Sequence, residues 1–356
     1  MLPPRWIRRT LLVPAVPVLT VLLLTLLPLW VIVAAGASIY LPGRWRALRV
    51  LAFLLVYLLA DTVMLVRLLW LWLASGLGRR LHEPRWQGRH YDAMRSYLAA
   101  LVRAGRRIFG VGFDLDAEDL LPASHGRDRP LLVLSRHAGP GDSFLLVHGL
   151  LQRGRRPRIV LKDTLQWSPV IDIGLNRVPC FFVGRGAPRG TGALAIRELA
   201  SDLGPDDALV LFPEGQNWTP SRRLRSIDSL EAAGRHDDAE AARELRHVLT
   251  PRAGGALAAL EGAASADVVF IVHTGLEHLV SVVDIWRGIP FGSDVSVKGW
   301  RVPRREVPTV PQAQDAWLQW WWRRIDAWLI DHLGTGAVPD AVVAVVAEEH
   351  VEPAPD

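Results

Sequence analysis

The sequence predicts an α/β fold, an αβα sandwich with a mostly parallel sheet, preceded by an N-terminal membrane-embedded helical hairpin. Two observations lead to this prediction. Short apolar runs of strand length alternate with helical patterns between residues 131 and 298. The first 80 residues instead contain long apolar segments of the length that a bilayer requires. We therefore expect membrane-anchoring helices at 1–80, a folded domain at 81–335 and a mobile C-terminal tail at 336–356.

The first apolar segment, Thr10–Gly43, contains no charged residue. As one straight helix it would extend roughly 50 Å, whereas the hydrocarbon core of a bilayer is about 30 Å thick. Pro14, Pro17 and Pro28 interrupt it, and proline inside a helix removes a hydrogen bond and bends the axis. The segment is also too long for a signal peptide. We expect a kinked, tilted or re-entrant path in the membrane.

The second apolar segment, Val50–Gly78, contains the charged residues Asp61 and Arg67, which are costly inside a true span. Basic residues flank both segments. They are Arg5, Arg8, Arg9, Arg44, Arg46, Arg49, Arg79, Arg80, Arg85 and Arg89. A two-span hairpin would place the middle group on the far side, against the positive-inside tendency. A re-entrant hairpin keeps all of them at the anionic cytoplasmic surface. We favour the re-entrant path and expect the folded domain at the cell membrane, facing the cytoplasm.

The folded domain begins with an amphipathic helix over Tyr91–Phe109, and six apolar runs follow as strand candidates. These runs are Leu131–Leu134, Arg158–Leu161, Cys180–Val183, Ala208–Phe212, Val268–Val272 and Asp294–Lys298. Helical patterns at Thr191–Leu203 and Pro251–Ala263 lie between them, as in a parallel sheet. The nucleotide-binding patterns GxGxxG and GxxxxGK[ST] are absent after any strand. Five tryptophans between 317 and 328 fit either a second membrane contact or a helix packed on the sheet.

The clearest candidate site follows the first of these strands. His137 and Asp142 lie five residues apart in a loop rich in glycine and proline. This spacing allows the carboxylate to bind one imidazole nitrogen, which leaves the other free to take a proton from a substrate hydroxyl.

Cys180 is the single cysteine of the chain, which excludes an intramolecular disulfide and a cysteine-based metal site.

Polar residues also follow three other strands. Lys162 follows the second strand candidate, Arg185 the third, and Glu214 and Gly215 the fourth. Ligands of open α/β sheets bind at the carboxyl ends of the strands. We therefore expect His137, Arg185 and Glu214 to converge on one rim of the sheet.

Together these motifs resemble the glycerolipid acyltransferase family, whose best-known members are the 1-acylglycerol-3-phosphate acyltransferases. His137 and Asp142 match its HxxxxD motif, Arg185 its arginine-bearing motif, and Phe212–Gly215 its FPEG motif. Val248–Gly254 is similar to the VLxPRxxG stretch of the longer, lysocardiolipin-acyltransferase-like branch, with Arg252 as its arginine.

Two positions depart from the family pattern. Arg136 stands where members often have asparagine or another small polar residue. Gln216-Asn217 stands where the family pattern FPEGTR continues with threonine and arginine, so the expected arginine is missing.

The resemblance implies transfer of a fatty acyl group from acyl-CoA or acyl carrier protein to the free hydroxyl of a lysophospholipid. The leading acceptor is 1-acylglycerol-3-phosphate, which would give phosphatidic acid. His137 would be the general base and Asp142 would hold it. The substrate-binding residues would be Arg185, Glu214, Gly215, Lys162 and Arg252. We expect no metal and no cofactor beyond the acyl donor, membrane lipids as partners, and no nucleic acid.

Three alternatives stay open at this point. The missing FPEGTR arginine leaves room for another acceptor, such as a lysocardiolipin-like, glycolipid or amine-bearing lipid. A membrane-bound metal-dependent hydrolase could use His137, Asp142 and His273, the last of which ends a strand and could equally be a core histidine. A non-catalytic membrane-binding protein could retain the same sheet.

Overall fold

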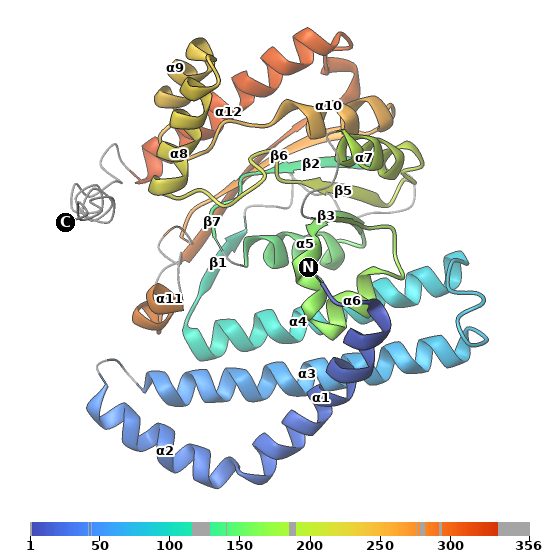
Figure 1. Cartoon of the computed structure of the whole chain (residues 1–356), viewed down its shortest axis with the longest axis vertical. Coiled ribbons are helices and arrows are strands. Elements are labelled where there is room, and N and C mark those ends of the chain that lie inside the picture. The colour runs from blue at the N-terminus through green and yellow to red at the C-terminus, as the bar shows by residue number, and fades with distance from the viewer. Residues whose placement is uncertain are drawn as a thin grey trace, which may run out of the picture.

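The computed structural model describes residues 2–41, 43, 45–115, 129–139, 141–184, 190–275, 277, 282–291 and 294–333. In this part of the chain, a central sheet lies between two helical layers, and three N-terminal helices form a further layer below (Figure 1). The tail predicted at 336–356 lies outside the described residues. The predicted boundary at residue 80 falls between the third and fourth helices.

Seven strands among the described residues form one sheet in the order β1-β7-β6-β2-β5-β3-β4. They are β1 (Gly112–Leu115), β2 (Leu131–Ser135), β3 (Arg156–Lys162), β4 (Phe181–Val183), β5 (Asp207–Leu211), β6 (Asp267–His273) and β7 (Asp294–Val302). All neighbours are parallel except β6 and β7, which are antiparallel. The predicted mostly parallel sheet is confirmed, and β1 is a strand that the sequence did not predict.

The central strand β2 sends its side chains alternately into two cores, because side chains in a strand point to opposite faces. Leu132 and Leu134 pack with residues of α7 (Thr191–Ser201), α10 (Ala253–Gly262) and α12 (Pro311–Leu333). Leu131 and Val133 pack on the other face with residues of α5 (Asp142–Gln152). Helices therefore cover both faces of the sheet, which confirms the predicted αβα sandwich. The other domain helices are α4 (Pro84–Phe109), α6 (Pro169–Leu175), α8 (Pro220–Ala232), α9 (His236–Glu244) and α11 (Val282–Gly288).

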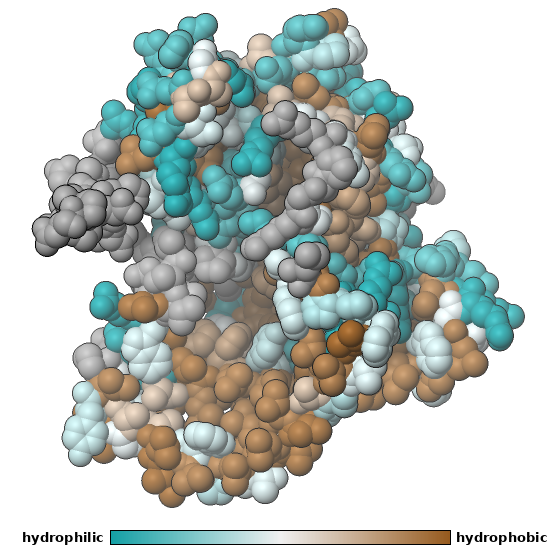
Figure 2. Space-filling model, viewed as in Figure 1, coloured by the Kyte–Doolittle hydropathy of each residue, from teal (hydrophilic) through white to brown (hydrophobic). Residues whose placement is uncertain are grey.

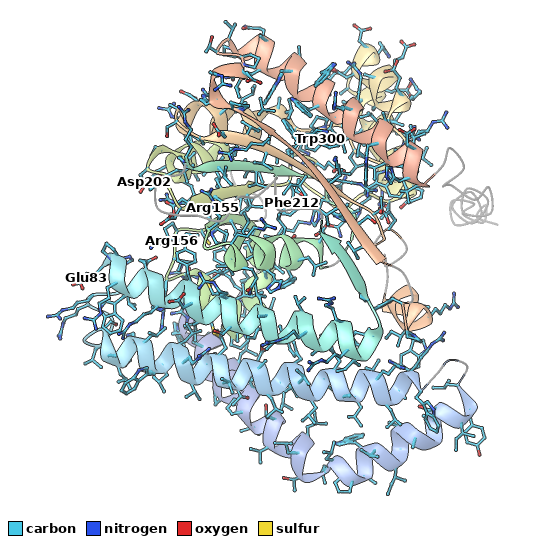
Figure 3. All side chains as sticks on the ribbon, turned by 180° about the vertical axis from the view of Figure 1, so that it is seen from behind. Glu83, Arg155, Arg156, Asp202, Phe212 and Trp300 are labelled. Atoms are coloured by element: carbon cyan, nitrogen blue, oxygen red, sulfur yellow. The ribbon has the colours of Figure 1, made fainter. Side chains whose placement is uncertain are left out.

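The tryptophans of α12 belong largely to the core between this helix and the sheet. Trp322 is fully buried, and the ring of Trp321 stacks on Phe270 of β6 with centroids 4.4 Å apart. Figure 3 shows Trp300 of β7 beside the same helix, and its ring lies 5.9 Å from that of Trp321. Of the two interpretations of this cluster, packing on the sheet accounts for these side chains.

The N-terminal layer consists of α1 (Arg5–Thr25), α2 (Leu27–Tyr40) and α3 (Arg46–Ala74). The first apolar segment breaks at Leu26, two residues before Pro28, as the prolines predict. By length and composition α1 and α3 could each cross a membrane, and only 22% and 17% of their most apolar windows are buried. Figure 2 shows apolar residues gathered over this layer. So large an exposed apolar surface is typical of a membrane-binding face.

Helix α3 lies lengthwise against α4 of the folded domain (Figures 1 and 3). Arg46 near its start donates to the carbonyl oxygen of Ile289 at 2.6 Å. Arg177 donates to the carbonyl oxygen of Leu68 near its other end, also at 2.6 Å. These two contacts are about 33 Å apart along the helix, at a rise of about 1.5 Å per residue. The folded domain therefore accompanies α3 over a distance comparable to the thickness of a bilayer core.

Polar side chains of the layer point toward the domain. Asp61 of α3 is buried and accepts a hydrogen bond from Tyr97 of α4 at 2.6 Å, which explains a carboxyl group inside an apolar helix. Arg8 and Arg9 of α1 both bind Asp172 of α6, at 3.2 and 3.0 Å. Arg49 donates to the carbonyl oxygen of Ile108 at the end of α4. The basic residues that flank the apolar segments thus include several that bind the domain itself.

Candidate active site

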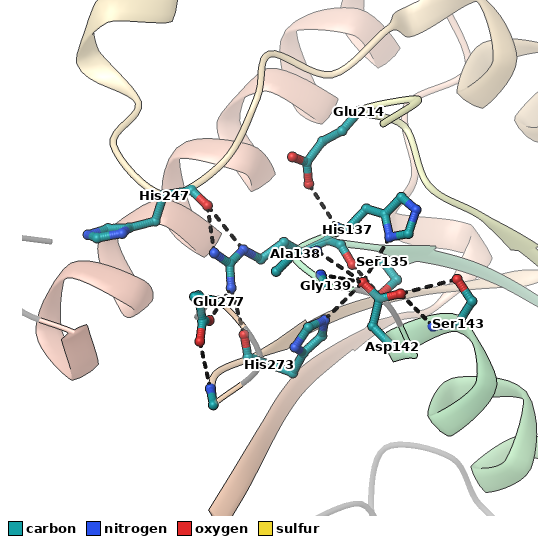
Figure 4. Close-up of polar contacts among 12 residues, drawn as sticks. Ser135, His137, Ala138, Gly139, Asp142, Ser143, Glu214, His247, His273 and Glu277 are labelled. Carbon is teal, nitrogen blue, oxygen red and sulfur yellow. Dashed lines mark hydrogen bonds and ion pairs between the residues drawn. The ribbon is translucent and has the colours of Figure 1, made fainter. Parts of the chain in front are cut away.

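The candidate site lies at the carboxyl ends of three neighbouring strands, β6, β2 and β5 (Figure 4). His137 follows β2 by two residues, Glu214 follows β5 by three, and His273 is the last residue of β6. Because parallel neighbours end at the same edge of a sheet, these side chains meet although they are up to 136 positions apart in the chain, the difference between 273 and 137.

His137 and Asp142 make the contact that their spacing predicts. Nδ1 of His137 lies 2.8 Å from Oδ2 of Asp142. The imidazole is 20% exposed, and its Nε2 makes no hydrogen bond to any described residue. Its ring packs on Phe212 with centroids 4.5 Å apart. The geometry leaves one nitrogen of an oriented histidine accessible to a substrate.

Asp142 is buried as the first residue of α5 and is held by several donors. Oδ2 also accepts from the backbone amides of Ala138 and Gly139, at 3.0 and 3.3 Å. Oδ1 accepts from the amide and hydroxyl of Ser143. Burial alone would raise the pKa of Asp142, but the hydrogen bond from His137 and the neighbouring imidazole of His273 more than offset it and hold the pKa well below its usual range. The carboxylate therefore stays ionised beside the imidazole.

The backbone of His137 is fixed from both sides. Its amide donates to Oε1 of Glu214 at 3.0 Å, and its carbonyl oxygen accepts from the amide of Trp218 at 2.6 Å. Oε2 of Glu214 accepts from the amide of Leu249 at 2.9 Å. Burial raises the pKa of Glu214 to about 8, because the two amide hydrogen bonds and the charge of Arg136 compensate only in part. Both oxygens of Glu214 thus bind backbone amides around His137, and its expected contact with an acceptor stays a prediction.

Gly215 and Arg252 are in contact at the edge of the site. Gly215 has a φ of +71°, in the left-handed region, and a Cβ there would lie 3.2 Å from Nη1 of Arg252. The amide of Arg252 donates to the carbonyl oxygen of Pro213 at 2.8 Å. The side chain of Arg252 is exposed, and no described residue forms an ion pair with it. The FPEG turn therefore carries an exposed guanidinium close to Glu214.

Of the remaining predicted residues, Lys162 lies farther along the sheet. Lys162 is exposed at the carboxyl end of β3. Arg185 lies outside the described residues, two positions after the end of β4. β4 is the third strand from β2 in the sheet, so the ends of β4 and β2 are roughly 14 Å apart at about 4.8 Å per strand. The structure brings together His137, Asp142, Glu214, Gly215 and Arg252, and it leaves Lys162 at a neighbouring strand end.

Arg136, the first departure from the family pattern, points away from the site and is fully buried. It donates to the carbonyl oxygen of His247 from Nε and Nη2, at 3.0 and 2.8 Å, and to that of His273 from Nη1, at 2.8 Å. The same Nη1 lies 2.6 Å from Oε1 of Glu277. Burial alone would raise the pKa of Glu277, yet the charge of Arg136 lowers it. This arginine joins the segment after β2 to the loop of His247 and to the segment from His273 to Glu277.

His273 is the residue whose place the sequence left undecided. Its Nε2 lies 3.5 Å from Oδ2 of Asp142, on the other side of the carboxylate from His137 (Figure 4). Only the strand order could reveal this neighbour, because β6 and β2 are adjacent in the sheet but separated by three strands in the chain.

No group of three or more histidine, cysteine, aspartate or glutamate side chains suited to a metal ion occurs within the described ranges. Oδ2 of Asp142 already accepts from His137 and from the amides of Ala138 and Gly139. These donors occupy the lone pairs that a metal ion would need.

A comparison with protein families matches residues 116–271 to the family described as acyltransferase. The matched segment contains the HxxxxD pair, the FPEG turn, Arg252 and the strands from β2 to most of β6. Comparisons with curated proteins and with solved structures found no match. The matched segment and the histidine–aspartate pair within it agree with the resemblance seen in the sequence. Residues 116–271 therefore match an acyltransferase domain, which supports the glycerolipid acyltransferase family.

Proposed function

We propose that this acyltransferase esterifies the free hydroxyl of a lysophospholipid, with acyl-CoA or acyl carrier protein as the donor. The leading acceptor is 1-acylglycerol-3-phosphate, and the product would be phosphatidic acid. The observation that carries the proposal is the partly exposed His137 whose Nδ1 is bound to the buried Asp142 at 2.8 Å. An imidazole in this arrangement can remove a proton at neutral pH.

In the proposed step, the acceptor oxygen attacks the carbonyl carbon of the thioester while Nε2 of His137 takes the hydroxyl proton. The carbon–sulfur bond then breaks, and the departing thiolate takes that proton from the imidazolium. His137 ends the cycle neutral. Asp142 stabilises the imidazolium between these events. Base catalysis of this kind contributes roughly 10²–10⁴-fold to the rate, so positioning of both substrates must supply the rest.

Arg252 is the cation that we propose for the acceptor phosphate. Its guanidinium lies against Gly215, next to the turn where the family arginine is missing. Other arginines near this turn are engaged: Arg222 donates to the carbonyl oxygen of Asn217, and Arg223 to that of Leu245. A guanidinium binds phosphate through two parallel hydrogen bonds. Lys162 would approach the substrates from the neighbouring strand end, and Arg185 stays a predicted substrate-binding residue.

Another lipid acceptor, lysocardiolipin-like, glycolipid or amine-bearing, is the second candidate. The observation that favours it is Gln216-Asn217 in place of the family threonine and arginine, which leaves amide groups where a cation is expected. Amides suit hydroxyl-rich headgroups better than they suit phosphate.

We propose that α1, α2 and α3 lie in one leaflet and that the domain faces the cytoplasm. Three features support this arrangement. The folded domain follows α3 along its length, Arg8 and Arg9 bind α6, and Arg46 binds the chain near Ile289. A helix that crossed the bilayer would have to draw these polar contacts into the hydrocarbon.

The experiment is a panel assay with the full chain in nanodiscs of defined lipid. Labelled acyl-CoA and acyl carrier protein are each offered with lysophosphatidate, lysocardiolipin, a lysoglycolipid and an amine-bearing lysolipid. The proposal expects acyl transfer to lysophosphatidate and a KM for it that rises roughly 10-fold or more in Arg252→Ala. Transfer only to one or more of the other three acceptors would replace the first candidate with the second. Release of free fatty acid alone, lost with a chelator, would support the hydrolase.

A further inference from the structure

His273 is a buried histidine that the proposed reaction does not use. It ends β6, its side chain is 7% exposed, and its carbonyl oxygen accepts from Arg136 at 2.8 Å. The next residue, Thr274, donates to the carbonyl oxygen of Ser296 in β7 at 2.9 Å. These bonds fix the backbone on both sides of His273. The direction in which its ring leaves the strand is therefore set by the fold.

The ring is directed at Asp142. Nε2 lies 3.5 Å from Oδ2, and neither ring nitrogen has a closer polar partner among the described residues. Buried polar groups generally find a hydrogen-bond partner, and Oδ2 is the acceptor within reach. Figure 4 shows the imidazoles of His137 and His273 on either side of this carboxylate.

We propose that His273 is a positioning residue for the proposed reaction: its Nε2–H donates to Oδ2 of Asp142 and keeps that oxygen directed at Nδ1 of His137. The inference rests on the function proposed above. A carboxylate that shares its charge with an additional imidazole donor stabilises the imidazolium of His137 less than the same carboxylate without that donor. His273 would therefore also set the pH at which His137 becomes a base.

The other charged groups around His273 form an ion pair of their own. Glu277 lies in the loop that follows β6, and the charges of His273 and Arg136 both lower its pKa, against the effect of burial. Arg136 and Glu277 are 2.6 Å apart, so their charges largely cancel at the imidazole. Glu214 binds the amide of His137 rather than its ring. Asp142 is thus the one acceptor, among the described residues, through which His273 can act on His137.

The test compares His273→Leu, His273→Asn and His273→Gln in the full chain. Leucine removes the donor, asparagine keeps an amide too short to reach Oδ2, and glutamine can place its amide nitrogen near the position of Nε2. The control is His148→Gln, because His148 lies on the same helix as Asp142 and makes no contact with it among the described residues.

The readout is the pH dependence of diethyl pyrocarbonate labelling of His137, followed by mass spectrometry of its peptide. The acid limb of kcat/KM for acyl transfer is measured in parallel. We expect the leucine and asparagine variants to shift both titrations upward by roughly one pH unit. Their kcat should fall about 10-fold, the order of the loss when a hydrogen-bond partner that orients a metal-bound histidine is removed. The glutamine variant and the control should titrate as the wild type does.

Two results would overturn the inference. The first is a titration of His137 that stays unchanged in both His273→Leu and His273→Asn. The second is a shift of that titration in His273→Gln as large as the shift in the leucine and asparagine variants. If the leucine variant does not fold, the comparison of the asparagine variant with the glutamine variant still tests the inference. Labelling needs no turnover, so a wild-type protein that transfers no acyl group would contradict the proposed function and leave this test intact.

Discussion

Arg8 in the first helix and Asp172 in α6 form a buried ion pair 3.2 Å long across 164 positions of the chain. Arg9 binds the same carboxylate at 3.0 Å, and Asn176 donates to it at 3.2 Å. Helix α6 lies between β3 and β4, the strands that carry Lys162 and lead to Arg185. The N-terminal layer is therefore joined to the part of the domain that borders the candidate site.

Removing this carboxylate should destabilise the protein. Asp172→Ala leaves the guanidinium of Arg8, 5% exposed, buried without its partner. We expect the free energy of unfolding to fall by about 3 kcal/mol, as when one partner of a buried pair is removed. Denaturant titration in detergent measures this. The control is Asp92→Ala, which breaks the exposed pair with Arg95 and should cost less than about 1 kcal/mol. Equal losses of unfolding free energy in the two variants would contradict a larger contribution from the buried pair than from the exposed pair.

The chain between α2 and α3 should lie on the same side of the membrane as the domain. Tyr40, at the end of α2, is 87% exposed. Tyr40→Cys and Ser201→Cys, each in a Cys180→Ser background, should react with a membrane-impermeant maleimide from the same face. Ser201 is exposed at the end of α7 and reports the side of the domain. Labelling of the two cysteines from opposite faces would require a two-span hairpin.

Gly215 should be needed for the placement of Arg252. Gly215→Ala puts a Cβ 3.2 Å from the guanidinium, in addition to the strain of a φ of +71°. We expect the KM for a phosphorylated acceptor to rise several-fold, with a loss of stability of about 1 kcal/mol. Gly234 has a φ of +72° and open space around its Cβ position. Gly234→Ala should therefore lose similar stability without any change in KM. An equal rise in KM in both variants would contradict the proposed contact between Arg252 and the acceptor.

Glu214 should make stability depend on pH. Its pKa is about 8 in the folded protein against 4.5 for an ordinary glutamate side chain, so the folded state binds a proton that the unfolded state has lost. The contribution is complete below pH 4.5 and is lost as the pH rises through 8. We expect the free energy of unfolding to fall by a few kcal/mol between about pH 5 and 8.5, on the order of the pKa difference. Glu214→Gln should be less stable at about pH 5 and should lack this slope. An identical slope in both proteins would contradict the raised pKa.

The sequence was informative wherever a single segment determines the structure. Apolar runs such as Leu131–Leu134 predicted the six strands from β2 to β7. Pro28 predicted the break after α1. The spacing of His137 and Asp142 predicted their contact, because both belong to one strand–loop–helix unit. Strand β1 was missed because four residues with an aspartate at the third position carry little periodicity.

Contacts between distant segments could not be predicted, because they depend on strand order and on the docking of helices. Arg136 read as an anomaly beside His137, and only the fold shows that it points to the loops of His247 and Glu277. Arg8 and Arg9 read as lipid-facing cations, and their partner Asp172 lies in a different part of the chain. The nearness of His273 to Asp142 follows from the pairing of β6 with β2.

The most direct test of the account is the rate of a single turnover with labelled acyl-CoA and lysophosphatidate, measured for wild type, His137→Ala and His148→Ala in the same nanodiscs. We predict that His137→Ala slows acyl transfer at least about 10³-fold while the far-UV spectrum and membrane binding are unchanged. His148→Ala should transfer at a rate close to that of the wild type. Transfer by His137→Ala at a rate within about tenfold of the wild type would contradict the assignment of His137 as the general base.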